Sequence, residues 1–222
     1  MFPVGDDDSA IRSTTFVTYM LVAINVLVFL LELSLGDAFI REWAFVPARF
    51  TLNPGGDAVT VLSAMFMHGG WMHLFGNMLY LWIFGNNVED RFGSTRFLAF
   101  YLVSGLAAAF AQYYFVPHSN IPNVGASGAI AGVLGAYLIL FPRARVNVVI
   151  GYNVVPMPAI MVLGFWIVLQ LFSGVGSIAA TDETMRDAGG VAYMAHVGGF
   201  FAGIVLALIM RRGSGGRTGR IA

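Results

Sequence analysis

Long apolar stretches recur along this chain, and they constrain its fold more than any other feature. They run over residues 16–35, 63–85, 96–115, 126–141, 156–175 and 191–210. Stretches of this kind cross the hydrocarbon core of a bilayer, which is roughly 30 Å thick. Hydrophobic residues make up 58% of the chain and charged residues only 11%, which leaves too little polar surface for a soluble domain. The sequence therefore predicts an all-α membrane protein, a bundle of six transmembrane helices forming one unit over residues 16–212.

Polar segments flank this unit. Residues 1–15 are acidic, unlike the positively charged start of a signal peptide or the Arg-rich, acid-poor composition of a transit peptide. We expect them to form a polar tail on the cytoplasmic side. Residues 213–222 carry Arg217 and Arg220 and are expected to form a flexible basic tail.

The arginines predict the orientation in the membrane. All twelve basic residues are Arg, and six spans place nine of them on the side that holds both termini. These nine are Arg12, Arg91, Arg96, Arg143, Arg145, Arg211, Arg212, Arg217 and Arg220. The positive-inside rule then puts both termini in the cytoplasm. The all-Arg usage and the lack of a transit peptide indicate a prokaryotic plasma membrane, and the net charge of zero argues against a nucleic-acid partner.

Polar side chains inside apolar stretches are costly, and by default they indicate function. His73 lies about ten residues into the second stretch, Ser127 opens the fourth, and His196 lies about five residues into the sixth. At about 1.5 Å per residue, all three are expected in the outer half of the membrane. Asn77 follows His73 by four residues and so shares its helix face.

Other intramembrane polar residues have simpler interpretations. Asn25, Gln112 and Gln170 are each expected to form hydrogen bonds between helices. Glu32 lies near a helix end, where its side chain can reach the interface.

Several kinds of chemistry are disfavoured by the residues present. His68 and His73 are five apart and point about 140° away from each other, and His73 with His196 would lack a third metal ligand. The chain has no Cys and no HExxH motif, and no Asp lies inside an apolar stretch. No metal and no cofactor are therefore implied.

Small residues at helix-packing spacing surround two of these polar residues. Gly128 and Gly132 follow Ser127, while Gly199 and Gly203 follow His196. Such pairs alone indicate only close helix packing. Together with the matching depths, they predict that a hydroxyl and an imidazole approach to about 3 Å, as an activated nucleophile requires.

Three motifs in this order resemble those of the rhomboid family of intramembrane serine proteases. They are HGGWMHLFGN over residues 68–77, GASG over 125–128 and AHVGGFFAG over 195–203. Glu89 and Arg91 fit the family's cytoplasmic Glu-x-Arg element, and the resemblance covers nearly the whole chain from the first span to the sixth. It implies an intramembrane serine endopeptidase that cleaves transmembrane segments of other membrane proteins.

The resemblance also implies roles for individual residues. Ser127 matches the nucleophile and His196 the general base, which gives a Ser-His dyad because no intramembrane carboxylate is available. His73 and Asn77 match oxyanion-hole side chains, Gly125 matches a position of close backbone approach, and His68 matches a supporting residue. A base must be neutral, so activity is expected to fall in acid.

The chain departs from the family pattern at two points. Ala131 stands where many members have an aromatic residue against the catalytic imidazole, and Tyr193, Tyr137 or Trp166 could take its place. The outer loop over residues 36–62, expected to be interfacial, lacks the family's Trp-Arg pair, although Glu42 and Trp43 are present.

Two alternatives remain open from the sequence. One is a catalytically inactive rhomboid-like protein that binds client membrane helices, and the other is a small transporter or channel. For a protease, we expect residues 176–190 and the outer part of the fifth helix to form a movable gate above a water-filled cavity. The oligomeric state and the substrate are left undetermined.

Overall fold

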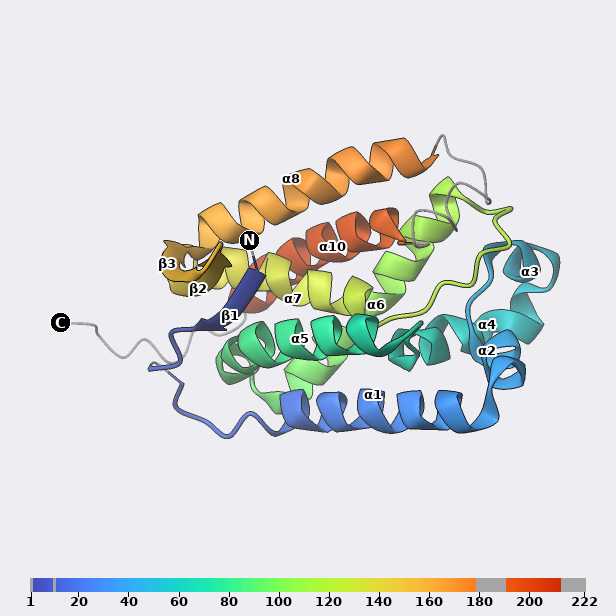
Figure 1. The fold of residues 1–222 in the computed structure, drawn as a ribbon, viewed down its shortest axis with the longest axis horizontal. Helices are drawn as coiled ribbons and strands as arrows, with labels where there is room; N and C mark the ends of the chain where they lie inside the picture. Colours follow the sequence, from blue (N-terminus) through green and yellow to red (C-terminus); the bar gives the residue numbers. More distant parts are fainter. Residues whose placement is uncertain (1, 10, 179–190, 213–222) are drawn as a thin grey trace.

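The described part of the chain folds into a bundle of six long helices with a small sheet at one end (Figure 1). This computed structural model describes residues 2–9, 11–178 and 191–212. The long helices are α1 (Phe16–Leu35), α5 (Trp71–Phe92), α6 (Ser94–Phe115), α7 (Ser127–Leu140), α8 (Ala159–Ile178) and α10 (Tyr193–Arg212). Shorter ones are α2 (Asp37–Trp43), α3 (Pro47–Leu52), α4 (Pro54–Ser63) and the 3₁₀ turn η1 (Ala64–Phe66). The strands are β1 (Phe2–Asp6), β2 (Arg145–Ile150) and β3 (Asn153–Pro158).

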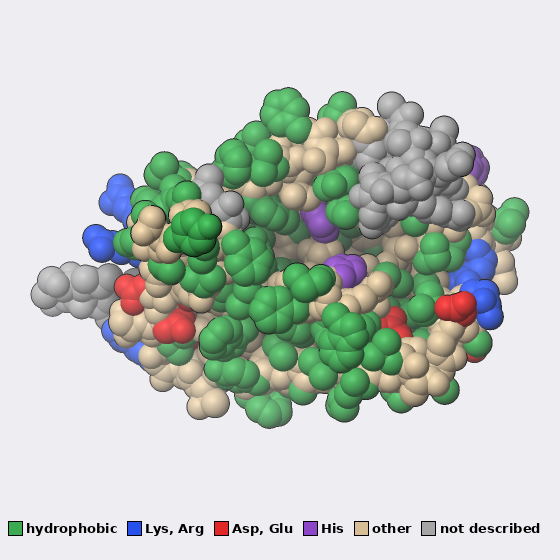
Figure 2. All heavy atoms as spheres, in the orientation of Figure 1, with side chains coloured by type: hydrophobic (Ala, Val, Ile, Leu, Met, Phe, Trp, Pro, Cys, Tyr) green, Lys and Arg blue, Asp and Glu red, His purple; other side chains and the backbone are tan. Residues whose placement is uncertain are grey.

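The surface of the bundle is apolar, as expected for a protein in lipid. Among the described residues, four helices are long and apolar enough to cross a membrane: α1, α6, and the segments Ala159–Gly176 and Tyr193–Arg211. Helix α7 is apolar but shorter, and α5 carries polar side chains along its length. Large hydrophobic side chains such as Leu27 and Phe172 point outward from these helices, and Figure 2 shows such side chains over much of one face. The protein is therefore an integral membrane protein.

Helix α7 lies at the centre of the bundle. Every residue from Gly128 to Tyr137 is buried, because α5, α6, α8 and α10 all pack against this helix. A helix enclosed by others need not meet lipid, which explains why the fourth stretch is the shortest of the six. Its bounds agree with the predicted range 126–141.

Glycines bring α7 and α10 into backbone contact. A Cβ added at Gly199 would overlap the carbonyl oxygen of Gly128, and one at Gly203 would lie 2.6 Å from the Cα of Gly132. No side chain larger than hydrogen fits at these crossings. The small-residue spacing in the sequence therefore corresponds to a real helix contact.

Two buried carboxylates attach α1 to α5 and to the segment that precedes it. Glu89, near the end of α5, accepts hydrogen bonds from the backbone N–H groups of Val17 and Thr18 at 2.9 and 2.7 Å. These N–H groups belong to the first turn of α1 and therefore have no partner within the helix. Glu32, near the other end of α1, is only 4% exposed and accepts from the backbone N–H of His68 at 3.0 Å. The interpretation of Glu32 as a side chain reaching the interface is therefore wrong, because depth along a helix does not reveal which face points inward.

The second apolar stretch does not form one helix over 63–85. Helix α5 begins only at Trp71 and extends to Phe92. The preceding residues form η1 and an extended segment in which Gly69 and Gly70 follow His68. His68 therefore lies before the helix that carries His73. The angle expected for two residues five apart on one helix does not apply to this pair.

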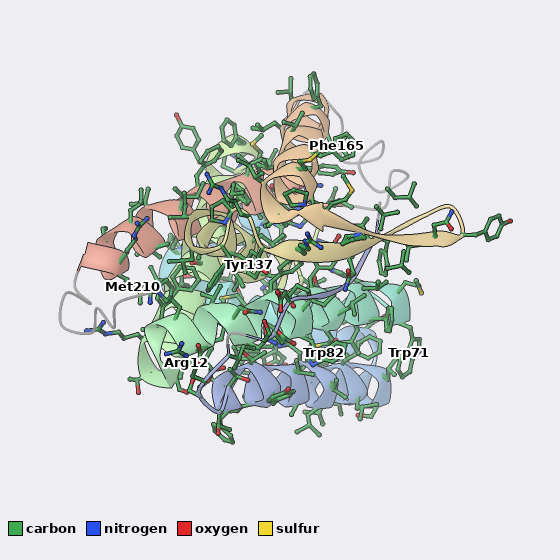
Figure 3. The ribbon with its side chains drawn as sticks, turned by 90° about the vertical axis from the view of Figure 1, so that its left-hand side faces the viewer. Arg12, Trp71, Trp82, Tyr137, Phe165 and Met210 are labelled. Atoms are coloured by element: carbon green, nitrogen blue, oxygen red, sulfur yellow. The ribbon has the colours of Figure 1, made fainter. Side chains whose placement is uncertain are left out.

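A three-stranded antiparallel sheet crosses one end of the bundle, which we call the sheet end. Strand β2 pairs with β3 and, on its other edge, with β1 from the N-terminal segment. Figure 3, viewed from this end, shows Tyr137 of α7 close beneath the strands, and its hydroxyl donates to Asp6 of β1 at 2.6 Å. The sequence analysis did not predict this sheet, so the fold is helical but not purely so. Pro156 and Pro158 belong to β3, and α8 starts after them.

The loop over residues 36–62 folds into α2, α3 and α4 at the opposite end (Figure 1). Arg49 holds them together by donating to the carbonyl of Ala44 at 2.6 Å and pairing with Asp57 at 2.8 Å. No residue of α2 is buried. The predicted tail over 213–222, and most of the predicted gate over 176–190, lie outside the described residues.

Candidate active site

Ser127 and His196 meet at the contact between α7 and α10. Ser127 is the first residue of α7, and His196 lies one turn into α10. Their side chains form a hydrogen bond of 2.8 Å between Ser127 Oγ and His196 Nε2. The Gly128–Gly199 backbone contact lies directly beside this pair, so the glycines set the approach that the hydrogen bond needs.

Backbone hydrogen bonds fix the segment before Ser127 to residues near α2 and η1, at the end of the bundle away from the sheet. Gly125 donates to Ala64 at 2.9 Å, and Asn123 donates to Phe45 at 2.7 Å. Gly125 has φ of 135°, a conformation that favours glycine. A Cβ there would lie 2.9 Å from His73 Nε2 and 3.5 Å from Ser127 Oγ, so glycine leaves a space between the hydroxyl and the imidazole of His73.

Hydrogen-bond donors face this space. The backbone N–H of Gly69 donates to His73 Nδ1 at 3.3 Å, so in the neutral ring the proton is on Nε2, the nitrogen beside Gly125. Asn77 lies one turn further along α5, and its Nδ2 is buried without a hydrogen-bond partner among the described residues. The backbone N–H of Ser127, in the first turn of α7, has no partner within the helix.

His68 lies behind His73 and outside the space itself. Its side chain is 2% exposed, and its ring meets the His73 ring edge to face with centroids 5.2 Å apart. It also packs edge to face on Phe29. His68 thus supports the position of His73 through packing, and its backbone N–H ties this region to Glu32 of α1.

A cavity of about 680 Å³ opens in front of these residues. His73, Asn77, Ser127 and His196 all line it, and its wall continues along apolar residues of α5, α7 and α8. None of the described residues that line it carries a formal charge. Figure 2 shows a hollow on this face with histidine side chains exposed in it.

Two residues of α8 surround His196. Gln170 Oε1 lies 2.7 Å from His196 Nδ1, and the indole of Trp166 packs against the imidazole with ring centroids 5.9 Å apart. Tyr193 meets the ring edge-on at 6.4 Å. Tyr137, the third candidate for this role, lies at the sheet end with Asp6 instead. Ala131 lines the cavity and offers no aromatic surface.

The three amides assigned to bonds between helices behave differently. Gln112 of α6 accepts from the backbone N–H of Ala195 in α10 at 3.2 Å, and Gln170 bridges α8 to α10. Asn25 donates to Leu21 within its own helix at 2.8 Å, and its side chain also interacts with the hydroxyl of Tyr101 in α6. The sequence analysis gave Gln170 no part in the site, because a single amide in an apolar helix carries no sign of its partner.

Among the residues that the structure describes, no three His, Asp or Glu side chains converge in a way that could hold an ion. The fold and the site together define a helical membrane protein with a hydrogen-bonded serine–histidine pair facing an internal cavity.

Comparisons with known proteins agree with this class. The family profile described as Rhomboid domain matches residues 55–213. Rhomboid protease GluP of Bacillus subtilis (strain 168) is 35% identical over 195 residues, which cover 86% of this chain and 35% of the relative. Rhomboid protein 1, mitochondrial, of Saccharomyces cerevisiae is 29% identical over 194 residues, 84% of this chain and 51% of the relative. RHOMBOID-like protein 5 of Arabidopsis thaliana is 34% identical over 155 residues, 70% of this chain and 45% of the relative.

This chain belongs to the rhomboid family. It spans between about a third and a half of the length of the relatives named above.

Proposed function

We propose that the protein is an intramembrane serine endopeptidase that cleaves a peptide bond in or beside a transmembrane segment of another membrane protein. The observation that carries this proposal is the 2.8 Å hydrogen bond between Ser127 Oγ and His196 Nε2. A serine hydroxyl is a poor nucleophile until an adjacent base takes its proton. Here the base lies within hydrogen-bond distance, and both groups face a cavity large enough for an extended peptide.

The reaction proceeds through an acyl-enzyme. Ser127 Oγ attacks the carbonyl carbon of the substrate as His196 Nε2 accepts the hydroxyl proton. The C–N bond then breaks, and the same imidazole delivers its proton to the departing amine. Water attacks the resulting ester with His196 again as base, which releases the second product and restores the hydroxyl.

Three donors would hold the oxyanion. They are the Nε2–H of His73, the Nδ2–H of Asn77 and the backbone N–H of Ser127. Gly125 keeps the space between them open, because any side chain there would meet the imidazole of His73. Donors preset in this way typically contribute about 10²–10³ each in rate.

All six long helices would cross the membrane in this proposal, with both termini in the cytoplasm. Nine of the twelve arginines then lie on the cytoplasmic side, as the positive-inside rule requires. The sheet end would face the cytoplasm, and α2, α3 and α4 would lie at the outer interface. A prokaryotic plasma membrane fits the arginine usage, and the reaction requires no cofactor or metal.

A substrate helix would enter beside α8. This helix packs mainly on α10, and the face turned away from the bundle carries exposed apolar side chains such as Phe165 and Phe172. We therefore assign the gate to the half of α8 that would lie toward the outer side of the membrane. A transmembrane substrate must unwind to present a bond to Ser127, which favours Gly, Ala or Ser near the cleaved bond.

The test is cleavage of a single-span substrate in proteoliposomes by the wild type, Ser127→Ala and His196→Ala. Cleavage by the wild type that both substitutions abolish is the expected result. A fluorophosphonate that labels the wild type but not Ser127→Ala would identify the nucleophile without any substrate. Ser127→Ala cleaving as fast as the wild type would refute the mechanism.

The same experiment separates the alternatives. Stable retention of the substrate helix without cleavage or fluorophosphonate labelling would indicate an inactive rhomboid-like binder of client helices. Solute flux without proteolysis would indicate a transporter.

A further inference from the structure

We propose that Gln170 is a positioning residue that fixes the tautomer and the orientation of His196, so that the serine–histidine pair is completed by an amide from α8. This inference rests on the proposed function and names a third residue on which the base depends. It is drawn from the hydrogen bond between Gln170 Oε1 and His196 Nδ1, 2.7 Å long.

The direction of this hydrogen bond determines which nitrogen can act as base. An amide oxygen only accepts, so the proton must be on His196 Nδ1. In a neutral imidazole, Nε2 then has a free lone pair, and Nε2 is the atom 2.8 Å from Ser127 Oγ. The opposite tautomer would place an N–H against the serine, which could not then give up its proton to this ring.

No other described polar side chain takes this role at Nδ1. In serine proteases with a triad, a carboxylate bound to the second imidazole nitrogen holds the tautomer and orients the ring. None of the described residues lining the cavity around His196 is acidic. The neutral amide supplies the acceptor without placing a charge in the interior of a membrane protein, where an unpaired carboxylate would be costly.

Helix α8 also supplies the packing surface for the imidazole. Trp166 lies four residues before Gln170, so the two side chains project from the same helix face. The indole lies over the His196 ring at an interplanar angle of 35° and also contacts Phe200. The amide thus holds the edge of the imidazole while the indole covers its face. Ala131 of α7 lines the same cavity as Trp166 and His196.

Both contacts come from the helix that we assign as the gate. Near its end α8 is close to α10, since a Cβ at Gly174 would lie 2.7 Å from the Cε of Met194. If α8 moved away from α10 to admit a substrate, Gln170 and Trp166 would leave His196 together. The base would then be ordered only when α8 is seated on α10, so that cleavage follows closure.

The decisive measurement is the tautomer of His196, read by ¹⁵N NMR of histidine-labelled protein in bilayers at a pH where the ring is neutral. The His196 signals are assigned by their loss in His196→Ala. In the wild type we expect the proton on Nδ1. In Gln170→Leu we expect a mixture of tautomers and a fall in kcat of about 10²-fold, with KM nearly unchanged, because the base loses its orientation but the cavity remains. Gln170→Glu keeps an acceptor at the same place and should retain the Nδ1–H form.

Gln112→Leu is the matched control. It removes another amide that bonds to α10. Gln112 accepts from the backbone of Ala195, the residue before His196, and does not contact the imidazole. We expect it to lower the thermal midpoint much as Gln170→Leu does while leaving the tautomer unchanged. A tautomer equally disturbed in both variants, or unaltered in Gln170→Leu, would overturn the inference.

Failure of the proposed function would give a different pattern. A wild type that neither cleaves nor reacts with a fluorophosphonate would count against the protease. The NMR comparison would still decide whether Gln170 controls His196. If Gln170→Leu does not fold, the tautomer in Gln170→Glu decides: loss of the Nδ1–H form there would contradict the role.

Discussion

Replacing Gly203 by alanine is expected to disable the protein from a position two turns away from His196. Gly203 faces Gly132 of α7 across the backbone contact between α7 and α10. An added Cβ would lie 2.6 Å from the Cα of Gly132, whereas ordinary contacts of such an atom begin near 3.4 Å. The neighbouring atoms are backbone, which cannot rotate away, so the two helices must separate by at least about 0.8 Å.

That separation is large compared with the tolerance of the site. Added along the line between the helices, it would lengthen the 2.8 Å bond between Ser127 and His196 to about 3.6 Å, which is no longer a hydrogen bond. A misplacement of about 1 Å can cost about 10² in rate. Overpacking of a close contact also destabilises by about 1–3 kcal/mol. We therefore expect Gly203→Ala to lose about 10²-fold in activity and to have a lower thermal midpoint.

Gly164→Ala provides the control. Gly164 lies within α8, and a Cβ there would meet nothing within 4 Å. Alanine favours a helix interior over glycine by about 1 kcal/mol, so this variant should be as stable as the wild type or more so, and should stay active. The assay is the rate of fluorophosphonate labelling of Ser127 and of substrate cleavage, with thermal unfolding in the same detergent. Wild-type rates in Gly203→Ala would refute the claim that the glycine contact sets the distance between the serine and the histidine.

Two further predictions concern the polar contacts near the sheet end. Glu89→Gln should destabilise the protein by about 3 kcal/mol, because the buried carboxylate that accepts from the first turn of α1 would be replaced by an amide whose NH₂ group also faces those backbone N–H donors. Thermal unfolding checks this, and Asp90→Asn should cost less, because the partly buried Asp90 accepts its hydrogen bonds from Arg12 and Ser13 at exposed positions. Burial, with the nearby Asp8 adding to the effect, raises the pKa of Asp6 from 3.8 to about 7. The folded protein therefore holds a proton that the unfolded chain has released between about pH 4 and 7, so this group makes stability fall as pH rises through that window. Asp6→Asn should flatten the slope and have a higher thermal midpoint than the wild type at pH 8 but not at pH 5; an unchanged slope would show that Asp6 does not carry it.

The helices were predictable from the sequence because each helix that crosses lipid needs a long apolar stretch. The first stretch was placed at 16–35, and α1 has those bounds. The sheet was not predictable in the same way, because β1 and β2 lie about 140 residues apart and their pairing depends on the completed bundle. Val146 and Val148 are fully buried, yet in the sequence they look like an interrupted start to the fifth apolar stretch.

Some residues of the candidate site could likewise be predicted from the sequence, and others could not. Ser127 and His196 could be proposed because their spacing, depth and flanking glycines form a pattern along the chain. The bond between Gln170 and His196 could not, since it depends on how α8 is rotated about its axis. Glu32 was misinterpreted for a related reason: its partner is the backbone of His68, and a backbone N–H leaves no mark in the sequence.

For the proposed protease, the arrangement of helices separates two conflicting demands. Attack on a peptide bond needs fixed distances, whereas entry of a substrate needs one wall of the site to move. Ser127 and His196 belong to α7 and α10, whose backbones touch through glycines and leave little freedom to shift. Gln170 belongs to α8, whose outer face is covered with apolar side chains suited to lipid and which packs mainly on α10. In the proposed mechanism the rigid contact keeps Ser127 beside His196 at all times, and movement of α8 would determine whether His196 carries its proton on the nitrogen that permits reaction.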